Sequence, residues 1–136
     1  MIQHKATAFC LCLAFCFLSG LFPAHPVWAA NQPSKELKRF LETLDQQNVR
    51  YGWKDIKCGG IPWEYHRTTR LHRPLIFAHF GKPSGDCILF FGGVHGDELP
   101  TVYLMFKLAH YIQDHPDVVK NKCIVIAPLV NPDGYL

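Results

Sequence analysis

The chain has few charged residues and no long run of one sign. Asp, Glu, Lys and Arg together make up 18% of its 136 residues, and the formal net charge is +3. A nucleic-acid-binding surface needs a basic patch or stripe, so the composition argues against nucleic acid as a partner. Intrinsic disorder is also disfavoured, because 49% of the residues are hydrophobic and aromatic side chains are plentiful.

Two functional motifs are missing from the sequence. It contains no Gly-x-Ser-x-Gly, so a serine hydrolase of the α/β type is a poor interpretation. It contains no Cys-x-x-Cys either, which argues against zinc held by cysteines. Internal repeats and low-complexity segments are absent, and the length fits one domain at most.

The N-terminal segment has the pattern of a secretory leader. One lysine precedes an apolar run over 6–22, and a tail of small residues follows. We predict a signal peptide at 1–29, cleaved after Ala29, and a mature domain at 30–136. The protein would then be exported to the periplasm or the extracellular space, with no stable membrane span after cleavage. The alternatives are an uncleaved membrane anchor and a lipoprotein signal ending at Cys16.

The first part of the mature chain predicts a helix and a strand margin. Ser34 can cap a helix in which apolar residues recur at i, i+3, i+4 and i+7 from Leu37 to Leu44, as in a packing helix. The segment 51–70 combines glycines and a proline with aromatic residues. It predicts one or two short strands at the margin of a sheet.

The later part predicts three strands and a second helix. An apolar strand over 74–80 and another over 87–91 are joined by turn residues, which predicts a hairpin in the middle of a covered sheet. A helix begins after Glu98 with Pro100 in its first turn, and a further apolar strand covers 123–130. Strand, helix and strand predict a right-handed crossover between parallel strands. The predicted fold class is α/β, with a doubly covered, mixed and mainly parallel sheet.

Two polar, glycine-rich motifs end two of these strands. His95-Gly-Asp-Glu98 follows the pair Gly92 and Gly93, and Asn-Pro-Asp-Gly follows the last strand at 131–134. Sites in α/β sheets lie at the carboxyl ends of the strands, so both motifs should face one edge. An imidazole and a carboxylate three positions apart can converge on one Zn²⁺. A plainer interpretation places Glu98 at a helix N-terminus, favoured by the dipole, with His95 as a loop residue.

The sequence alone does not decide how the three cysteines outside the leader are bonded. Cys87 lies eight residues before His95, at the start of a predicted strand. Cys123 lies at the same spacing before Asn131. On neighbouring strands the two thiols would therefore sit at similar height, within the range of a disulfide, although a direct bridge across parallel strands is strained. An odd number of cysteines means one free thiol or a bond to something outside this chain, and a Cys87–Cys123 bond with Cys58 free is one hypothesis.

Taken together, the motifs resemble those of the zinc carboxypeptidase family of the carboxypeptidase A type. The resemblance runs from about Trp63 to the C-terminus and rests on FFGGVHGDELPTVYLMFKLAHYI and IVIAPLVNPDGYL. The family's first two zinc ligands match His95 and Glu98, and its Asn-Pro-Asp-Gly turn forms a wall of the cleft. The resemblance implies a sheet of the zinc carboxypeptidase type, Zn²⁺ as cofactor, and cleft-shaping roles for Gly92, Gly93, Asn131, Pro132, Asp133 and Gly134.

The resemblance also implies an activity, which is hydrolysis of peptide bonds by a metallocarboxypeptidase or amidase. The His-Gly-Asp-Glu form is most similar to bacterial murein peptide amidases, so the substrate would be a peptide, plausibly a cell-wall peptide, or an N-acyl amino acid. In the family, the third zinc ligand, the oxyanion arginine and the catalytic glutamate all lie beyond the Asn-Pro-Asp-Gly turn. We therefore expect an N-terminal part of such a domain, with unknown catalytic residues downstream of Leu136, inactive alone and binding zinc weakly. A non-catalytic remnant and an N-acyl amino acid amidohydrolase of the desuccinylase type are the alternatives.

Overall fold

The computed structural model describes residues 34–82 and 86–136. Its elements in chain order are α1 (Lys35–Arg50), β1 (Ala78–Gly81), β2 (Cys87–Phe91), α2 (Leu99–Asp114), the 3₁₀ helix η1 (Pro116–Val119), β3 (Cys123–Ala127) and α3 (Pro132–Tyr135). The predicted leader at 1–29 lies outside the described residues, so its cleavage and the export of the protein stay predictions. Across the two described ranges, no helix combines the length and the apolar character needed to cross a membrane.

The first helix, α1, forms as its sequence pattern predicts. The hydroxyl of Ser34 accepts a hydrogen bond from the backbone N–H of Leu37 at 3.1 Å, which satisfies one of the free donors at the helix start. The buried face of α1 consists of Leu37, Phe40, Leu41, Leu44 and Asn48. Its apolar members belong to the single hydrophobic cluster that also includes side chains of α2 and β3.

The segment 51–70 forms no named strand, contrary to the prediction for it. Its backbone makes two isolated antiparallel bridges, Glu64 with Phe77 and Thr68 with Pro74. Pro74 has no backbone N–H to donate, so it cannot contribute a donor to a regular strand ladder. The strand predicted over 74–80 begins only at Ala78, because Pro74 and Phe77 make these isolated bridges and do not pair with β3.

The three described strands form a mixed sheet in the order β1-β3-β2. β3 runs antiparallel to β1 and parallel to β2. The predicted hairpin between β1 and β2 is therefore wrong, because β3 lies between them. β3 is the most buried of the three strands, and its central position satisfies the hydrogen-bonding groups on both of its edges. The sheet is mixed as predicted, but it is not mainly parallel, since each pairing type occurs once among the described strands.

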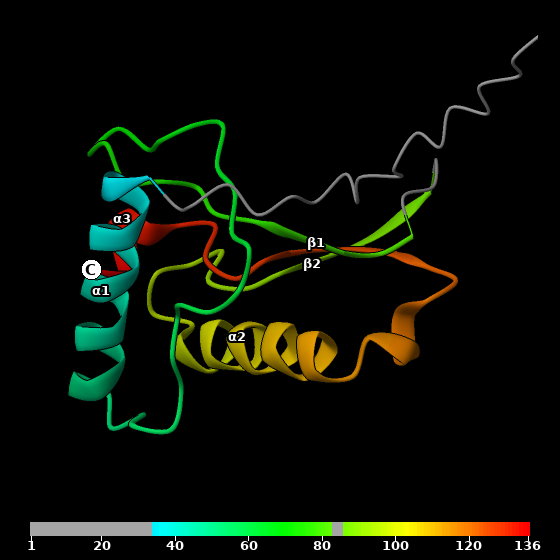
Figure 1. Ribbon diagram of the computed structural model, residues 1–136. Coiled ribbons are helices and arrows are strands. Elements are labelled where there is room, and N and C mark those ends of the chain that lie inside the picture. The colour runs from blue at the N-terminus through cyan, green and yellow to red at the C-terminus, as the bar shows by residue number, and fades with distance from the viewer. Residues whose placement is uncertain (1–33, 83–85) are drawn as a thin grey trace, which may run out of the picture.

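One long helix covers this sheet. Figure 1 shows α2 running along one side of the strands, while α1 and α3 stand together beyond one end of the sheet. Val102, Phe106, Ala109 and Ile112 form the buried face of α2. The predicted parallel unit of strand, helix and strand is confirmed by β2, α2 and β3.

The predicted cover on both faces is not found among the described residues, where β2 is an edge strand. Its side chains are mostly exposed, including Ile88, Leu89 and Phe91 at about half of their maximal exposure. β2 is therefore not the covered central strand that its apolar sequence predicts. The structure is a small mixed α/β fold, and its three-stranded sheet does not show the carboxypeptidase-type fold.

A disulfide joins the first residues of β2 and β3. Cys87 and Cys123 are direct neighbours in the parallel register, with their Cα atoms 4.5 Å apart. Cys58 is free and buried. The structure confirms the hypothesis of a Cys87–Cys123 bond with Cys58 free.

Candidate metal centre

The parallel pairing of β2 and β3 continues past the ends of both strands and brings the two polar motifs together. The N–H of Gly92 donates to the carbonyl of Ala127 at 3.0 Å, and that of Val130 donates back to Gly92 at 3.0 Å. The N–H of Asn131 then donates to the carbonyl of Gly93 at 2.9 Å. The expectation that both motifs face one edge of the sheet is confirmed.

Gly92 and Gly93 are needed for packing at the start of α2. A Cβ atom on Gly92 would lie 2.6 Å from the carbonyl oxygen of Thr101, and Gly93 has φ +58, a backbone conformation that favours glycine. A Cβ on Gly93 would also lie 2.6 Å from a methyl group of Leu129. Because neither glycine has a side chain, α2 and the segment after β3 can pack closely against them.

Gly96 and Gly134 place the backbones of the two motifs in direct contact. A Cβ atom on Gly96 would lie 2.1 Å from the carbonyl carbon of Gly134. In the other direction, a Cβ on Gly134 would lie 3.0 Å from the Cα of Gly96. Sequence reasoning did not single out Gly96, although a glycine inside each motif was a signal for such a close approach.

The imidazole of His95 and the carboxylate of Glu98 meet in this exposed loop. His95 Nδ1 lies 3.0 Å from Glu98 Oε1, and the two side chains are 74% and 45% exposed. Glu98 occupies the position before the first turn of α2, but its carboxylate makes no capping hydrogen bond in that helix. It lies where the helix dipole favours a negative charge, yet its side-chain contact is with His95.

The chemistry of this pair fits zinc. A ring nitrogen and a carboxylate oxygen are both common zinc ligands, and two ligand atoms on a tetrahedral zinc ion lie roughly 3.3 Å apart. The observed 3.0 Å separation is close to that value. Within 34–82 and 86–136, no group of three or more His, Cys, Asp or Glu side chains could hold a metal ion. The structure brings together the two side chains that the sequence predicts as zinc ligands, and their 3.0 Å contact is a hydrogen bond.

The Asn-Pro-Asp-Gly turn forms the short helix α3 beside this loop. Asn131 Oδ1 accepts a hydrogen bond from the N–H of Gly134 at 3.0 Å, and Pro132 occupies the first turn of the helix. Pro132 and Tyr135 are buried, while Asn131 and Asp133 are partly exposed. The turn is thus capped by its own first residue.

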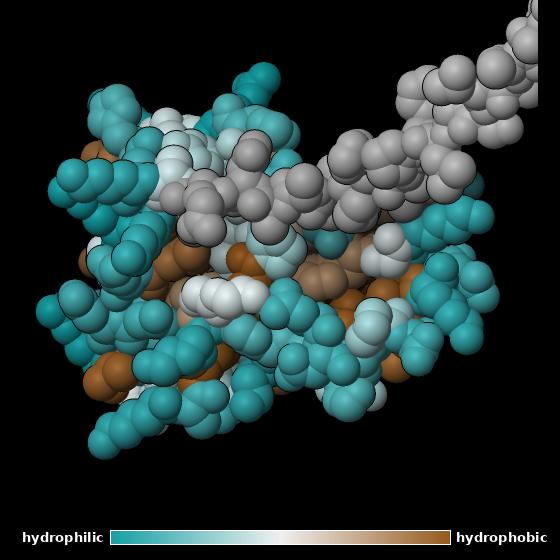
Figure 2. Space-filling model, viewed as in Figure 1, coloured by the Kyte–Doolittle hydropathy of each residue, from teal (hydrophilic) through white to brown (hydrophobic). Residues whose placement is uncertain are grey.

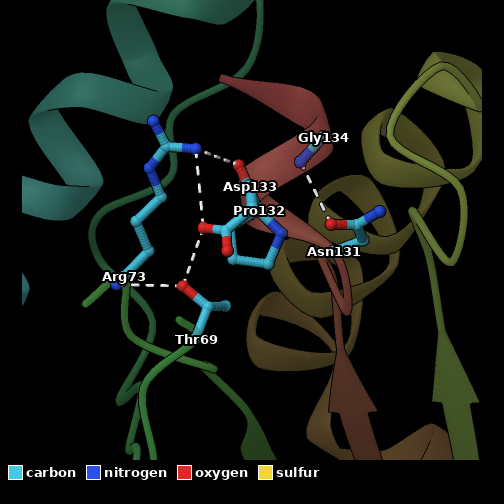
Figure 3. Close-up of polar contacts among 6 residues, drawn as sticks. All are labelled: Thr69, Arg73, Asn131, Pro132, Asp133 and Gly134. Atoms are coloured by element: carbon cyan, nitrogen blue, oxygen red, sulfur yellow. Dashed lines mark hydrogen bonds and ion pairs between the residues drawn. The ribbon is translucent and has the colours of Figure 1, made fainter. Parts of the chain in front are cut away.

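Two side chains from a distant hairpin contact the same turn (Figure 3). Thr69 Oγ1 donates to Asp133 Oδ1 at 2.7 Å, and Arg73 Nη1 donates to the carbonyl of Pro132 at 2.9 Å. Arg73 Nη1 also forms an ion pair with Asp133 Oδ1 at 3.6 Å. Sequence reasoning missed Thr69 and Arg73, because no local spacing indicates that the segment 69–73 reaches the turn at 131–134.

A buried polar network anchors the other side of α3. The hydroxyl of Tyr135 donates to Asn48 Oδ1, and Asn48 Nδ2 donates to the sulfur of Cys58 at 3.2 Å. The hydroxyl of Tyr51 donates to the carbonyl of Tyr135 at 3.0 Å. The position of α3 is therefore fixed against α1 by side-chain hydrogen bonds.

Four other described histidines make their contacts with residues outside this loop. The ring of His110 contacts the carbonyl of Lys57, and the ring of His115 lies tilted against that of Tyr111. His66 and His79 each pack against the ring of Phe77.

Comparisons of the chain with protein-family models, curated proteins and solved structures find no match.

Proposed function

We propose that the protein is a zinc-dependent hydrolase of the metallocarboxypeptidase or amidase type, to which this chain contributes two zinc ligands, His95 and Glu98. One observation carries the proposal, which is the 3.0 Å contact between the imidazole and the carboxylate in an exposed loop at the end of β2. The close contact between Gly96 and Gly134, which joins this loop to the Asn-Pro-Asp-Gly turn, supports it. The carboxypeptidase-type fold is part of the proposal, supported by the parallel unit of β2, α2 and β3.

The chain's own residues have defined tasks in this reaction. Zinc would bind a ring nitrogen of His95 and a carboxylate oxygen of Glu98, so metal binding would replace the hydrogen bond between the two side chains. Bound zinc would polarise the scissile carbonyl and lower the pKa of its water. The exposure of both side chains leaves the site open to a peptide or an N-acyl amino acid, plausibly a cell-wall peptide. In this proposal the turn at 131–134 would form one wall of a substrate cleft, and we assign the catalytic base to no described residue.

Zinc titration of the purified chain against a chromophoric chelator tests the ligand pair. We expect weak binding by the wild-type chain, because two ligands leave the rest of the coordination sphere to water, and at least tenfold weaker binding after His95→Ala or Glu98→Ala. His115→Ala is the matched control, since this exposed histidine lies at the far end of α2, and it should bind zinc as the wild type does. Equal zinc affinity of the wild type and His95→Ala would overturn the proposal.

A further inference from the structure

The hairpin turn at 69–73 has a fixed backbone conformation. The N–H of Thr69 donates to the carbonyl of Arg73 at 2.9 Å, and the N–H of His72 donates to the carbonyl of Thr69 at 3.0 Å. His72 has φ 60, a left-handed backbone conformation that is uncommon outside glycine. The hydroxyl of Thr69 also accepts from the N–H of Arg73 at 3.2 Å. The two side chains that reach the Asn-Pro-Asp-Gly turn therefore start from a rigid base.

These side chains hold the turn through charged contacts that are partly shielded from water. The carboxylate of Asp133 accepts a hydrogen bond from the hydroxyl of Thr69 at 2.7 Å. The guanidinium of Arg73 lies 3.6 Å from the same carboxylate. The side chains of Arg73 and Asp133 are only 27% and 25% exposed. Hydrogen bonds to charged groups are stronger than neutral ones, and partial burial reduces their screening by solvent.

The turn at 131–134 and the loop of His95 are in direct backbone contact. Gly134 follows Asp133, and its backbone touches Gly96, with no space for even a methyl group between them. Gly96 is the residue after His95, and Glu98 follows two positions later. The turn therefore supports the backbone on which both proposed ligands are mounted.

We infer that Arg73 and Thr69 are positioning residues for the proposed zinc ligands, acting through Asp133 and the Gly134–Gly96 contact. This inference rests on the proposed function, but its structural step is measurable without metal. It predicts that loosening the turn at 131–134 also loosens the loop at 92–98.

Hydrogen exchange of the full chain, read by mass spectrometry without added zinc, tests this coupling. The reporters are the amides of Gly93, which donates to the hydroxyl of Thr101, and of Glu98, which donates to the carbonyl of His95. In Arg73→Ala we expect about tenfold faster exchange in peptides covering 92–98 and 131–135, the size expected for losing a charged hydrogen bond. Arg67→Ala, an exposed arginine of the same hairpin, should leave both peptides unchanged.

Two further variants separate positioning from general loss of stability. A single nitrogen of Arg73 makes both contacts, so Arg73→Lys should restore much of the protection that Arg73→Ala loses. Thr69→Val removes only the hydroxyl and should give a smaller acceleration in the same two peptides. The inference is overturned if exchange at 92–98 stays at the wild-type rate in both Arg73→Ala and Thr69→Val, or if Arg67→Ala accelerates it equally. Because no zinc is present, this outcome is distinct from a failure of the zinc titration.

Discussion

At the scale of single residues, three buried polar side chains decide how the end of the chain is held. Tyr135, Asn48 and Cys58 form a continuous hydrogen-bonded series between α3 and α1. Burial raises the pKa of the Cys58 thiol, and the nearby Asp45 carboxylate raises it further. Burial likewise raises the pKa of the Tyr135 hydroxyl. Both groups therefore stay protonated in the folded protein at pH values where they ionise in the unfolded chain.

The stability of the protein should consequently fall in alkaline solution. For a group whose pKa is raised by folding, the folded state holds more protons, so its contribution is complete below the unfolded pKa and is lost as pH rises above it. The unfolded values are about 8.5 for cysteine and about 10 for tyrosine. Urea unfolding from about pH 7 to about pH 11 should show a decline that begins near these values.

Tyr135→Phe is the matched variant for this decline. It loses the hydrogen bond to Asn48, so it should be less stable by about 1 kcal/mol at neutral pH. Its stability should nevertheless fall less than that of the wild type above the tyrosine pKa, because one ionising group is gone. An identical alkaline decline in both proteins would show that Tyr135 does not contribute.

The sequence predicts some residues of the candidate site and not others, for a physical reason. His95 and Glu98 are predictable because their spacing and their place after a strand are local properties. Arg73 reaches Pro132 and Asp133 across 59 positions of sequence or more, through a hairpin whose approach depends on tertiary packing. The contact of Gly96 with Gly134 is equally non-local, and only the glycines themselves indicate it.

At the scale of elements, helices were easier to predict than strand pairing. Ser34 and Pro100 mark the starts of α1 and α2. The buried face of each helix follows from the period of the apolar residues in that helix alone. The neighbour of β1 is decided by burial of the whole sheet. β3, distant in sequence, takes the central place and displaces the hairpin that the turn residues favour.

The disulfide between β2 and β3 should stabilise the crossover that carries the site. Cys87 and Cys123 are 36 positions apart and enclose α2 in their loop. Closing a loop of this length should stabilise the fold by about 4 kcal/mol through the entropy of the unfolded chain. Urea unfolding of the Cys87→Ala, Cys123→Ala double variant should show a loss of this order.

Alkylation followed by peptide mapping shows directly which cysteines are disulfide-bonded. In denaturant without reductant, the peptide with Cys58 should be labelled, while Cys87 and Cys123 should react only after reduction. Labelling of all three without reductant would contradict the pairing. In the folded protein Cys58 should be unreactive, because it is buried and its thiol stays protonated.

At the scale of the whole molecule, the hydrophobic core joins α1, α2 and the strands, but apolar surface remains outside it. Figure 2 shows apolar residues in the middle of one face, bordered by hydrophilic side chains. β2 has the densest group of exposed apolar residues in a strand, with Ile88 at 49%, Leu89 at 52% and Phe91 at 54% exposure. It is also an edge of the described sheet. An apolar edge strand is a template for association with another strand.

We therefore expect the purified chain to self-associate through β2 as its concentration rises. Leu89→Lys should suppress this association, because a lysine on an edge strand opposes strand addition by charge repulsion and by its hydration. The substitution should cost little stability, since Leu89 is already half exposed. Leu104→Lys on α2 is the matched control, with 56% exposure and no place on the sheet edge, and it should associate as the wild type does. Sedimentation velocity over a concentration series separates the outcomes: a monomeric wild type, or equal suppression by both substitutions, would exclude the β2 edge as the surface responsible.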